Sequence, residues 1–442
     1  MKGSRLLAAL MALALAAPAL GADEPGVFKV PGTDSTIKLY GYVQLDTTLD
    51  LTGRIGDIED NDWAIYLPGA PQTKVCSAAG CIDNPYAKKA NPQLYMTART
   101  SRFGIQTNTP TDVGNIGVKL EGDFNAPNGF QSETFTNSVL FRLRHAYGTF
   151  NGFLAGQTWS TFLDLSAYPD VVDFNGPGDL ALVRNPMLRY TFALAPGATL
   201  AIAAENARGT QYGQSAPRKF QSIPDFHANL TYTGAWGHVS VRGVTQQYSI
   251  FQTTAPDGTA INDKKTAWGV SGAVSGSAKL GGDTLVAQFV GGQGVGRYLL
   301  NASGATQNVT SPAGVSNSAI GGNPGAFFIK ANGDLQLITV YGYHVGFTHV
   351  WDKAFRSNLV WSQTFIQDPK IDPVTGVSGP VGNDVQKTLN QAFVNTFYSF
   401  AKNAELGLEY SWGQWKSFTG GGAPELKGDL NRITMTLHYN FY

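Results

Sequence analysis

The sequence has few charged residues, few cysteines and, beyond its first 22 residues, no long apolar run. Charged side chains make up 14 % of the 442 residues, against roughly 25 % in an average soluble domain. A transmembrane helix needs about 18 or more consecutive apolar residues, and the chain after residue 22 contains no such run. Its 32 basic and 32 acidic residues leave no positive excess. The composition therefore excludes a helical membrane protein and argues against a nucleic-acid partner.

Cysteine is almost absent, with only Cys76 and Cys81 in the segment CSAAGC. In an exported protein this spacing predicts a disulfide that closes a small loop. A two-cysteine metal site is the weaker alternative, because no histidine lies in the surrounding segment. We therefore expect no metal site, and no motif in the chain predicts a cofactor.

The first 22 residues have the three parts of a secretory signal peptide. Lys2 and Arg5 precede the apolar core LLAALMALALAA, and small residues follow up to Gly21 and Ala22. We expect cleavage after Ala22 or Gly21, which leaves a single exported domain of residues 23–442. Loss of Lys2 and Arg5 leaves 30 basic residues against 32 acidic ones, so that domain is nearly neutral.

What the chain has instead is one recurring unit. Runs of about ten residues carry apolar side chains at every second position, and turn residues separate them, which is the signal of antiparallel strands. One run alternates Leu188, Tyr190, Phe192 and Leu194 with other residues. Aromatic residues gather near the run ends, as in an interfacial girdle; they are Tyr232, Trp236, Trp268, Trp351 and Trp412.

The connections between the runs fall into two sizes. Seven are short, and they begin at Pro110, Asn151, Ala195, Thr233, Ser277, Asp352 and Lys402. Eight are long and polar or glycine-rich: Leu51–Pro92, Asn125–Ser138, Ser160–Pro186, Asn206–Phe226, Ser249–Lys265, Gly291–Gln336, Gln367–Thr388 and Lys416–Gly428. This alternation predicts an all-β fold, a transmembrane antiparallel β-barrel of 16 strands with short periplasmic turns and long outer loops. A soluble all-β protein is the alternative, but its loops need not separate by length and its outward face would be polar.

Alternation also assigns the side chains that face the inside of the barrel. Apolar residues on the lipid side place six basic residues inside: Arg99, Arg102, Lys119, Arg142, Arg144 and Arg189. Arg99 and Arg102 are both inside only if a β-bulge near Thr100 shifts the phase by one. In the same scheme Tyr147 faces outward, and His145 lies on an outward phase as an interfacial residue. Such a basic set favours anions in a pore, although it could instead balance Glu121 and Asp123 or hold a loop in place.

The third long connection is the candidate constriction, at about residues 160–186. It carries four acidic residues: Asp164, Asp170, Asp173 and Asp179. We predict that this loop folds into the barrel and that its carboxylates face the basic wall, which creates a transverse field. An ordinary surface loop is the alternative.

No local motif of a hydrolase, metalloprotease or nucleotide-binding loop occurs. The stretch GGQGVG at Gly291 opens a loop rather than a helix, so it is not a dinucleotide fingerprint. A barrel hydrolase would need a serine and a histidine brought together at one rim. We therefore expect a pore and not an enzyme.

Several segments resemble the DcaP-like family of trimeric outer-membrane porins. They are VPGTDSTIKLYGYVQLD, RTSRFGIQTNTPTDVGNIGVKLEGDF, RLRHAYGTFNGFLAGQTWSTFLD, VDFNGPG and RNPMLRYTF. The resemblance covers the first six predicted strands densely and the later ones in pattern. It implies a sixteen-stranded homotrimer in the lipid of the Gram-negative outer membrane, with passive uptake of small anionic solutes such as dicarboxylates. A general, weakly selective porin is the main alternative, and a phosphate- or sugar-selective channel follows.

Overall fold

A computed structural model describes residues 25–52, 74–77, 80–83, 92–125, 140–206, 218–220, 222–254, 258, 260–302, 325–368, 370, 386–418 and 427–441. The predicted signal peptide, residues 1–22, lies outside these ranges. No helix among the described residues has the length and apolar character needed to cross a bilayer.

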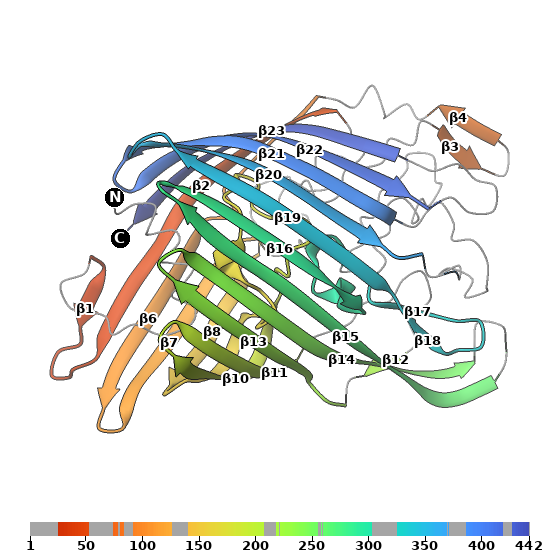
Figure 1. The fold of residues 1–442 in the computed structure, drawn as a ribbon, viewed down its shortest axis with the longest axis horizontal. Coiled ribbons are helices and arrows are strands. Elements are labelled where there is room, and N and C mark those ends of the chain that lie inside the picture. Colours follow the sequence, from red (N-terminus) through yellow and green to blue (C-terminus); the bar gives the residue numbers. More distant parts are fainter. Residues whose placement is uncertain are drawn as a thin grey trace.

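The described chain forms a closed antiparallel barrel of sixteen strands, as the two loop sizes predicted (Figure 1). Closure comes from the last strand pairing with the first, where Leu45 lies opposite Leu437. The strands in chain order are β2 (Thr36–Thr52), β5 with β6 (Gln93–Thr97, Arg102–Thr111), β7 (Gly114–Asp123), β8 (Arg142–Phe150), β9 (Phe153–Trp159), β10 (Arg184–Ala195), β11 (Ala198–Glu205), β13 (Asp225–Gly234), β14 (Gly237–Thr254), β15 (Ala260–Leu280), β16 (Asp283–Gln293), β19 (Thr339–Val350), β20 (Phe355–Ile366), β21 (Gln386–Ala401), β22 (Ala404–Ser417) and β23 (Lys427–Phe441). Closure leaves no unpaired sheet edge in the hydrocarbon layer.

The outer face of the barrel is apolar because side chains alternate along each strand. Leu188 is 58 % exposed and Leu194 is 56 % exposed, whereas Met187 and Arg189 on either side of Leu188 are buried. Val239 and Val241 are likewise exposed on β14, while His238 and Ser240 are buried. An apolar exterior over a polar interior is the pattern of a barrel in lipid.

The predicted phase shift near Thr100 is present. β5 and β6 form one interrupted wall strand, since both pair with β2. A turn joins them, closed by a hydrogen bond from the Ser101 amide to the Ala98 carbonyl at 3.0 Å. The wall strand thus has one residue more than β2 at this point, and Arg99 is buried.

A second irregularity, on β8, corrects the predicted orientation of two side chains. The register between β7 and β8 shifts so that Glu121 lies opposite His145 while Gly122 lies opposite Leu143. Arg144 is therefore an inserted residue, and the phase of the strand reverses after it. The exposed fraction is 4 % for His145 and 8 % for Tyr147. The prediction that both face outward was wrong, because a strict alternation cannot include a bulge.

The two ends of the barrel differ as predicted (Figure 1). Tight turns join the strands at one end, and short extra strands lie toward the other: β3 (Lys74–Ser77), β4 (Gly80–Asp83), β12 (Arg218–Phe220), β17 (Phe327–Ile329) and β18 (Leu335–Leu337). Cys76 and Cys81 are opposite each other in the β3–β4 pairing, but their side chains lie outside what the structure describes. The connection expected at Ser249–Lys265 is much shorter, since β14 continues to Thr254 and β15 begins at Ala260.

A short N-terminal strand, β1 (Val27–Lys29), pairs with the start of β2. Three short 3₁₀ turns complete the described elements: η2 (Leu165–Ala167), η3 (Val295–Arg297) and η4 (Leu300–Ala302). They belong to two segments that fold into the barrel. We call residues 160–183 the inner loop, and residues 294–302 with 325–338 the second inner segment.

Candidate functional site

The inner loop lies inside the barrel, because its contacts reach strands on the far side of the ring. The amides of Val172 and Asp173 donate to Glu409 on β22, at 2.8 and 3.0 Å. The Gly178 amide donates to Gln391 on β21 at 2.8 Å. These bonds satisfy backbone groups that would otherwise need water.

Four of the six predicted basic residues gather around two carboxylates. We call this group the ionic cluster: Arg102, Lys119, Arg142 and Arg144 with Glu121 and Asp123. Arg142 binds Asp123 through two nitrogens, at 2.8 and 2.7 Å. Arg144 bridges the two acids, at 2.9 Å from Glu121 and 2.7 Å from Asp123. Four positive groups against two negative ones leave a net charge of +2 on β6, β7 and β8.

The other two predicted basic residues lie nearby on the wall. Arg99 is 5 % exposed, and its guanidinium carbon is 5.9 Å from the centre of the Tyr95 ring. Arg189 is 6 % exposed on β10, opposite Leu154 of β9. All six are thus on or beside the strands β5 to β10.

The four aspartates of the inner loop bind the opposite part of the wall rather than the ionic cluster. Asp164 accepts hydrogen bonds from His238 at 2.8 Å and from Ser275 at 2.5 Å. Asp170 is 2.5 Å from Arg356, and Asp173 is 4.0 Å from Arg432. Each carboxylate therefore has a polar partner that holds the loop in place.

Asp179 makes the most extensive of these anchors. It binds His344 at 2.8 Å, Ser362 at 2.9 Å and Gln288 at 3.1 Å. The second ring nitrogen of His344 is 2.9 Å from the Ala167 carbonyl oxygen. Both nitrogens face acceptors, so His344 donates twice and binds the inner loop at two points when it is protonated. Neither His344 nor Glu409 was predicted, because a loop's partner on a distant strand leaves no signal in the local sequence.

The second inner segment was also not predicted to fold inward. It forms an apolar cluster with the inner loop and the wall, which we call the packed cluster and whose members include Phe162, Tyr298, Leu299, Phe328 and Ile338. The Leu300 amide donates to the Leu180 carbonyl at 3.0 Å and joins the two segments directly. A dry cluster of this kind excludes water and solutes from the part of the barrel that it fills.

A buried polar network fixes the second inner segment to the wall. Arg297 is ion-paired with Asp225, and the Tyr298 hydroxyl donates to Asp225 at 2.6 Å. The same hydroxyl is 3.0 Å from His227, which lies 3.5 Å from Glu205. Burial raises the pKa of Tyr298 well above its usual range, so its hydroxyl remains a hydrogen-bond donor.

One serine and one histidine do meet inside the barrel. His238 has Ser277 at 2.7 Å on one ring nitrogen and Asp164 at 2.8 Å on the other. Burial acts to raise the pKa of Asp164, but the hydrogen bonds from His238 and Ser275 and the charge of Arg242 outweigh it and lower the pKa to about 2. The Arg242 guanidinium binds Phe162, Ser275 and Gln288. The arrangement therefore anchors the start of the inner loop.

The sequence profile of the porin subfamily matches residues 21–431 of this chain. The chain belongs to the porin subfamily. It is also 25 % identical over 283 residues to porin Omp2b of Brucella neotomae and to its counterpart in Brucella suis, covering 58 % of this chain and 68 % of each relative. The porin family and the barrel fold indicate a channel of the Gram-negative outer membrane rather than an enzyme.

Solved structures give the same fold. The outer membrane channel DcaP of Acinetobacter baumannii matches 95 % of this porin and 100 % of its own chain, with 24 % identity and a TM-score of 0.69. Salmonella typhi OmpF matches 94 % of this porin and 100 % of its own chain, with 12 % identity and a TM-score of 0.52. The resemblance to DcaP-like porins is confirmed at the level of the fold. In the described part of the chain, no group of three or more His, Cys, Asp or Glu is arranged to hold a metal ion.

Proposed function

We propose that this porin passes small solutes by passive diffusion and prefers anions, with carboxylates and dicarboxylates as its main class. The observation that carries the proposal is the ionic cluster, in which four basic groups share two carboxylates on one side of the barrel. Guanidinium groups match the geometry of carboxylates. Basic rings in a pore raise the local concentration of anions.

The packed cluster limits the route that a solute can take through the barrel. It joins the inner loop to β14, β15, β16, β19 and β20 through Val244, Ala273, Val290, Val340 and Ile366. A solute that avoids this dry region passes along β5 to β10, beside the ionic cluster. Arg142, whose side chain is 30 % exposed, is the member of the ionic cluster that solutes reach most easily.

Reversal potentials in planar bilayers under a KCl gradient test the proposed preference. We expect a reversal potential whose sign shows that anions permeate more readily than cations. The Arg142→Gln variant should give a smaller reversal potential of the same sign. Arg356→Gln is a control, since Arg356 binds Asp170 and Glu405 away from the ionic cluster. Clear cation selectivity of the unmodified protein would contradict the proposal.

A general porin with weak selectivity is the second candidate. It is favoured by the pairing of charges, because Glu121 and Asp123 already neutralise part of the cluster and every inner-loop aspartate has a partner. Liposome swelling separates the two proposals. Faster entry of dicarboxylates than of sugars and neutral amino acids of similar size supports the anion channel, and equal rates support the general porin.

Within the described part of the chain, hydrolysis would have to use Ser277, the serine beside His238. We expect no labelling of Ser277 by a fluorophosphonate probe in the folded protein, since Asp164 and His238 serve to anchor the loop. Labelling that the Ser277→Ala variant abolishes would instead establish a nucleophile.

Three further proposals concern assembly and processing. We propose a homotrimer, as the resemblance to DcaP-like porins implies, and the mass of the native protein in detergent tests it. We also propose cleavage of the signal peptide after Ala22 or Gly21, and a disulfide between Cys76 and Cys81. The intact mass of the exported protein, with and without reduction and alkylation, tests both.

A further inference from the structure

Within the described part of the chain, Arg184 differs from the basic residues of the ionic cluster in having no acidic partner. It is the first residue of β10, directly after the inner loop, and it lies opposite Trp159 of β9. Among the residues that the structure describes, no carboxylate lies within ion-pair distance of its guanidinium. Its Nε atom is buried and makes no hydrogen bond to the described residues.

The position of the guanidinium is nevertheless fixed. Its central carbon is 3.5 Å from the centre of the Trp159 ring, and Arg144 approaches the same ring at 5.7 Å. Trp159 itself packs against the packed cluster, so the stacked pair lies on the inside of the barrel. Stacking holds the plane of a guanidinium and leaves the donors at its edge available.

The charges around Arg184 are mostly of its own sign. Those that act on it most strongly are Arg144, Arg102 and Arg142, with Glu121 opposing them. A partly buried cation without a counter-charge is costly. Arg242 shows the contrast, because it also lacks a described carboxylate within ion-pair distance but donates to three oxygen atoms of its neighbours.

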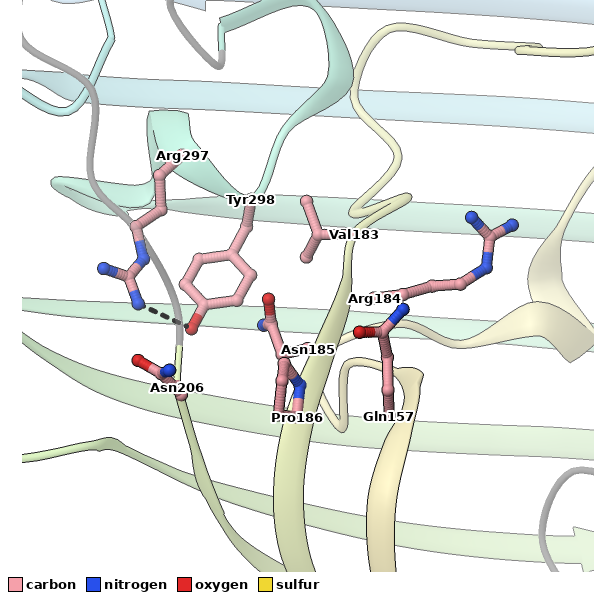
Figure 2. Close-up of a pocket in the computed structure, with 8 residues that line it drawn as sticks. All are labelled: Gln157, Val183, Arg184, Asn185, Pro186, Asn206, Arg297 and Tyr298. Atoms are coloured by element: carbon pink, nitrogen blue, oxygen red, sulfur yellow. Dashed lines mark hydrogen bonds between the residues drawn. The ribbon is translucent and has the colours of Figure 1, made fainter. Parts of the chain in front are cut away.

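A cavity of about 430 Å³ adjoins this residue, and Arg184, Arg297, Gln157 and Asn185 are among its lining residues (Figure 2). Figure 2 shows the Arg184 side chain running away from Arg297 and Tyr298. Arg297 is already neutralised by Asp225. Arg184 is therefore a lining residue of this cavity without an acidic partner among the described residues, and it lies beside the ionic cluster through the Trp159 ring that it shares with Arg144.

We propose that Arg184, stacked on Trp159, forms a carboxylate-binding subsite through which solutes pass beside the inner loop. The proposal rests on the anion preference proposed above and names the residue that binds the solute rather than merely attracting it. A carboxylate supplies the missing counter-charge and accepts two parallel hydrogen bonds from the edge of the guanidinium. The ionic cluster attracts anions in general, whereas Arg184 distinguishes a planar oxyanion from chloride.

The test compares Arg184→Gln with Arg189→Gln. Both variants remove one positive charge from β10, so a general electrostatic effect changes them alike. Sodium acetate is titrated into the chloride solution around a single channel, and the concentration that half-inhibits the chloride current is measured. We expect Arg184→Gln to raise this concentration about tenfold, the effect of losing one charge-assisted hydrogen bond, and Arg189→Gln to change it less than about twofold.

Arg184→Lys separates the charge from its geometry. We expect it to keep the anion-to-cation permeability ratio while weakening inhibition by acetate. An ammonium group does not stack flat on an aromatic ring and does not offer two parallel N–H donors to a carboxylate. Trp159→Phe should weaken inhibition without any change of charge. The difference between heated and unheated samples in gel migration checks that each variant is folded.

The outcomes separate this proposal from the function on which it rests. Equal effects of Arg184→Gln and Arg189→Gln, or no inhibition of the unmodified channel by acetate, would overturn the subsite. Neither result would contradict the anion preference of the channel. Cation selectivity of the unmodified channel would overturn the anion preference itself.

Discussion

The two sides of the lumen are built from different physical interactions. Along β6, β7 and β8, charged side chains bind one another and carry a net positive charge. Along β14, β15, β16, β19 and β20, two chain segments fold inward and bury apolar side chains against the wall. The same alternation of side chains produces both walls, because only the chemistry of the inward residues differs. One side is therefore suited to attract solutes, and the other narrows the space through which they move.

The largest effect should come from removing the anchor that joins the inner loop to the packed side. Asp179→Ala leaves His344 buried without its carboxylate, and breaking a buried ion pair costs about 3–5 kcal/mol. We expect a lower free energy of unfolding in urea and a higher, noisier single-channel conductance, since the inner loop loses three bonds.

A matched control for this variant is Asp283→Ala. Asp283 also binds a histidine, His349 at 3.0 Å, but it lies at the turn end of the barrel and its hydrogen bonds go to β19 rather than to the inner loop. Its removal should leave conductance unchanged. Equal changes in the two variants would show that Asp179 does not position the loop.

The packed cluster itself can be opened at Phe328. This side chain is fully buried, and a Phe→Ala change in a core costs about 3–5 kcal/mol. We expect the Phe328→Ala variant to admit larger uncharged sugars in liposome swelling, with its ion selectivity nearly unchanged. Phe328→Leu retains most of the volume and should behave like the unmodified protein. A change in ion selectivity without a change in the size limit would contradict the division into two sides.

On the side of the lumen that carries the ionic cluster, we expect substitutions to change the ion selectivity. Glu121→Gln preserves the shape of the side chain but removes one of the two negative charges of the cluster, so the reversal potential should move further toward anions. Glu405→Gln is the control, because it removes the same charge beside Arg356, on the other side. If Glu405→Gln shifted the potential as much, the ionic cluster would not govern selectivity.

The smallest effect is a pH dependence at Asp164. Its folded pKa of about 2 lies below the value of about 3.9 for an unfolded aspartate. A lowered folded pKa contributes stability that is complete above the unfolded value and is lost as the pH falls through the folded one. The stability difference between the unmodified protein and Asp164→Asn should therefore be constant from pH 8 to about 5 and shrink below about 4. A difference that already declines between pH 7 and 5 would contradict the assignment.

Strand order, barrel closure and the separation of loop lengths were all predictable, because they depend on local patterns. Period-two alternation marks each strand, and glycine-rich turns mark their ends. Even the interruption at Thr100 was predictable, since two arginines could not both face inward without it. The bulge at Arg144 was not predictable, because one inserted residue in RLRHAY leaves both phases of alternation chemically acceptable. The prediction therefore assigned His145 and Tyr147 to the wrong face.

The candidate site was predictable in its components and not in its pairings. The six basic residues and the inner loop are identifiable from phase and position. That the loop's aspartates bind His238, His344 and Arg356, rather than facing the ionic cluster, follows from contacts across the ring between residues far apart in the chain. Arg184 escaped notice because it lies where the inner loop becomes a strand and alternation no longer assigns a face.

The sequence by itself determined the barrel, since alternating side chains and a closed ring are the way in which strands satisfy their backbone groups in lipid. Only the tertiary structure decided how the lumen is divided. Which inward residues neutralise each other, which segments fill the interior and whether a described cation such as Arg184 has an acidic partner depend on distances across the barrel. No local pattern encodes those distances, because they are set jointly by the strands that surround the lumen.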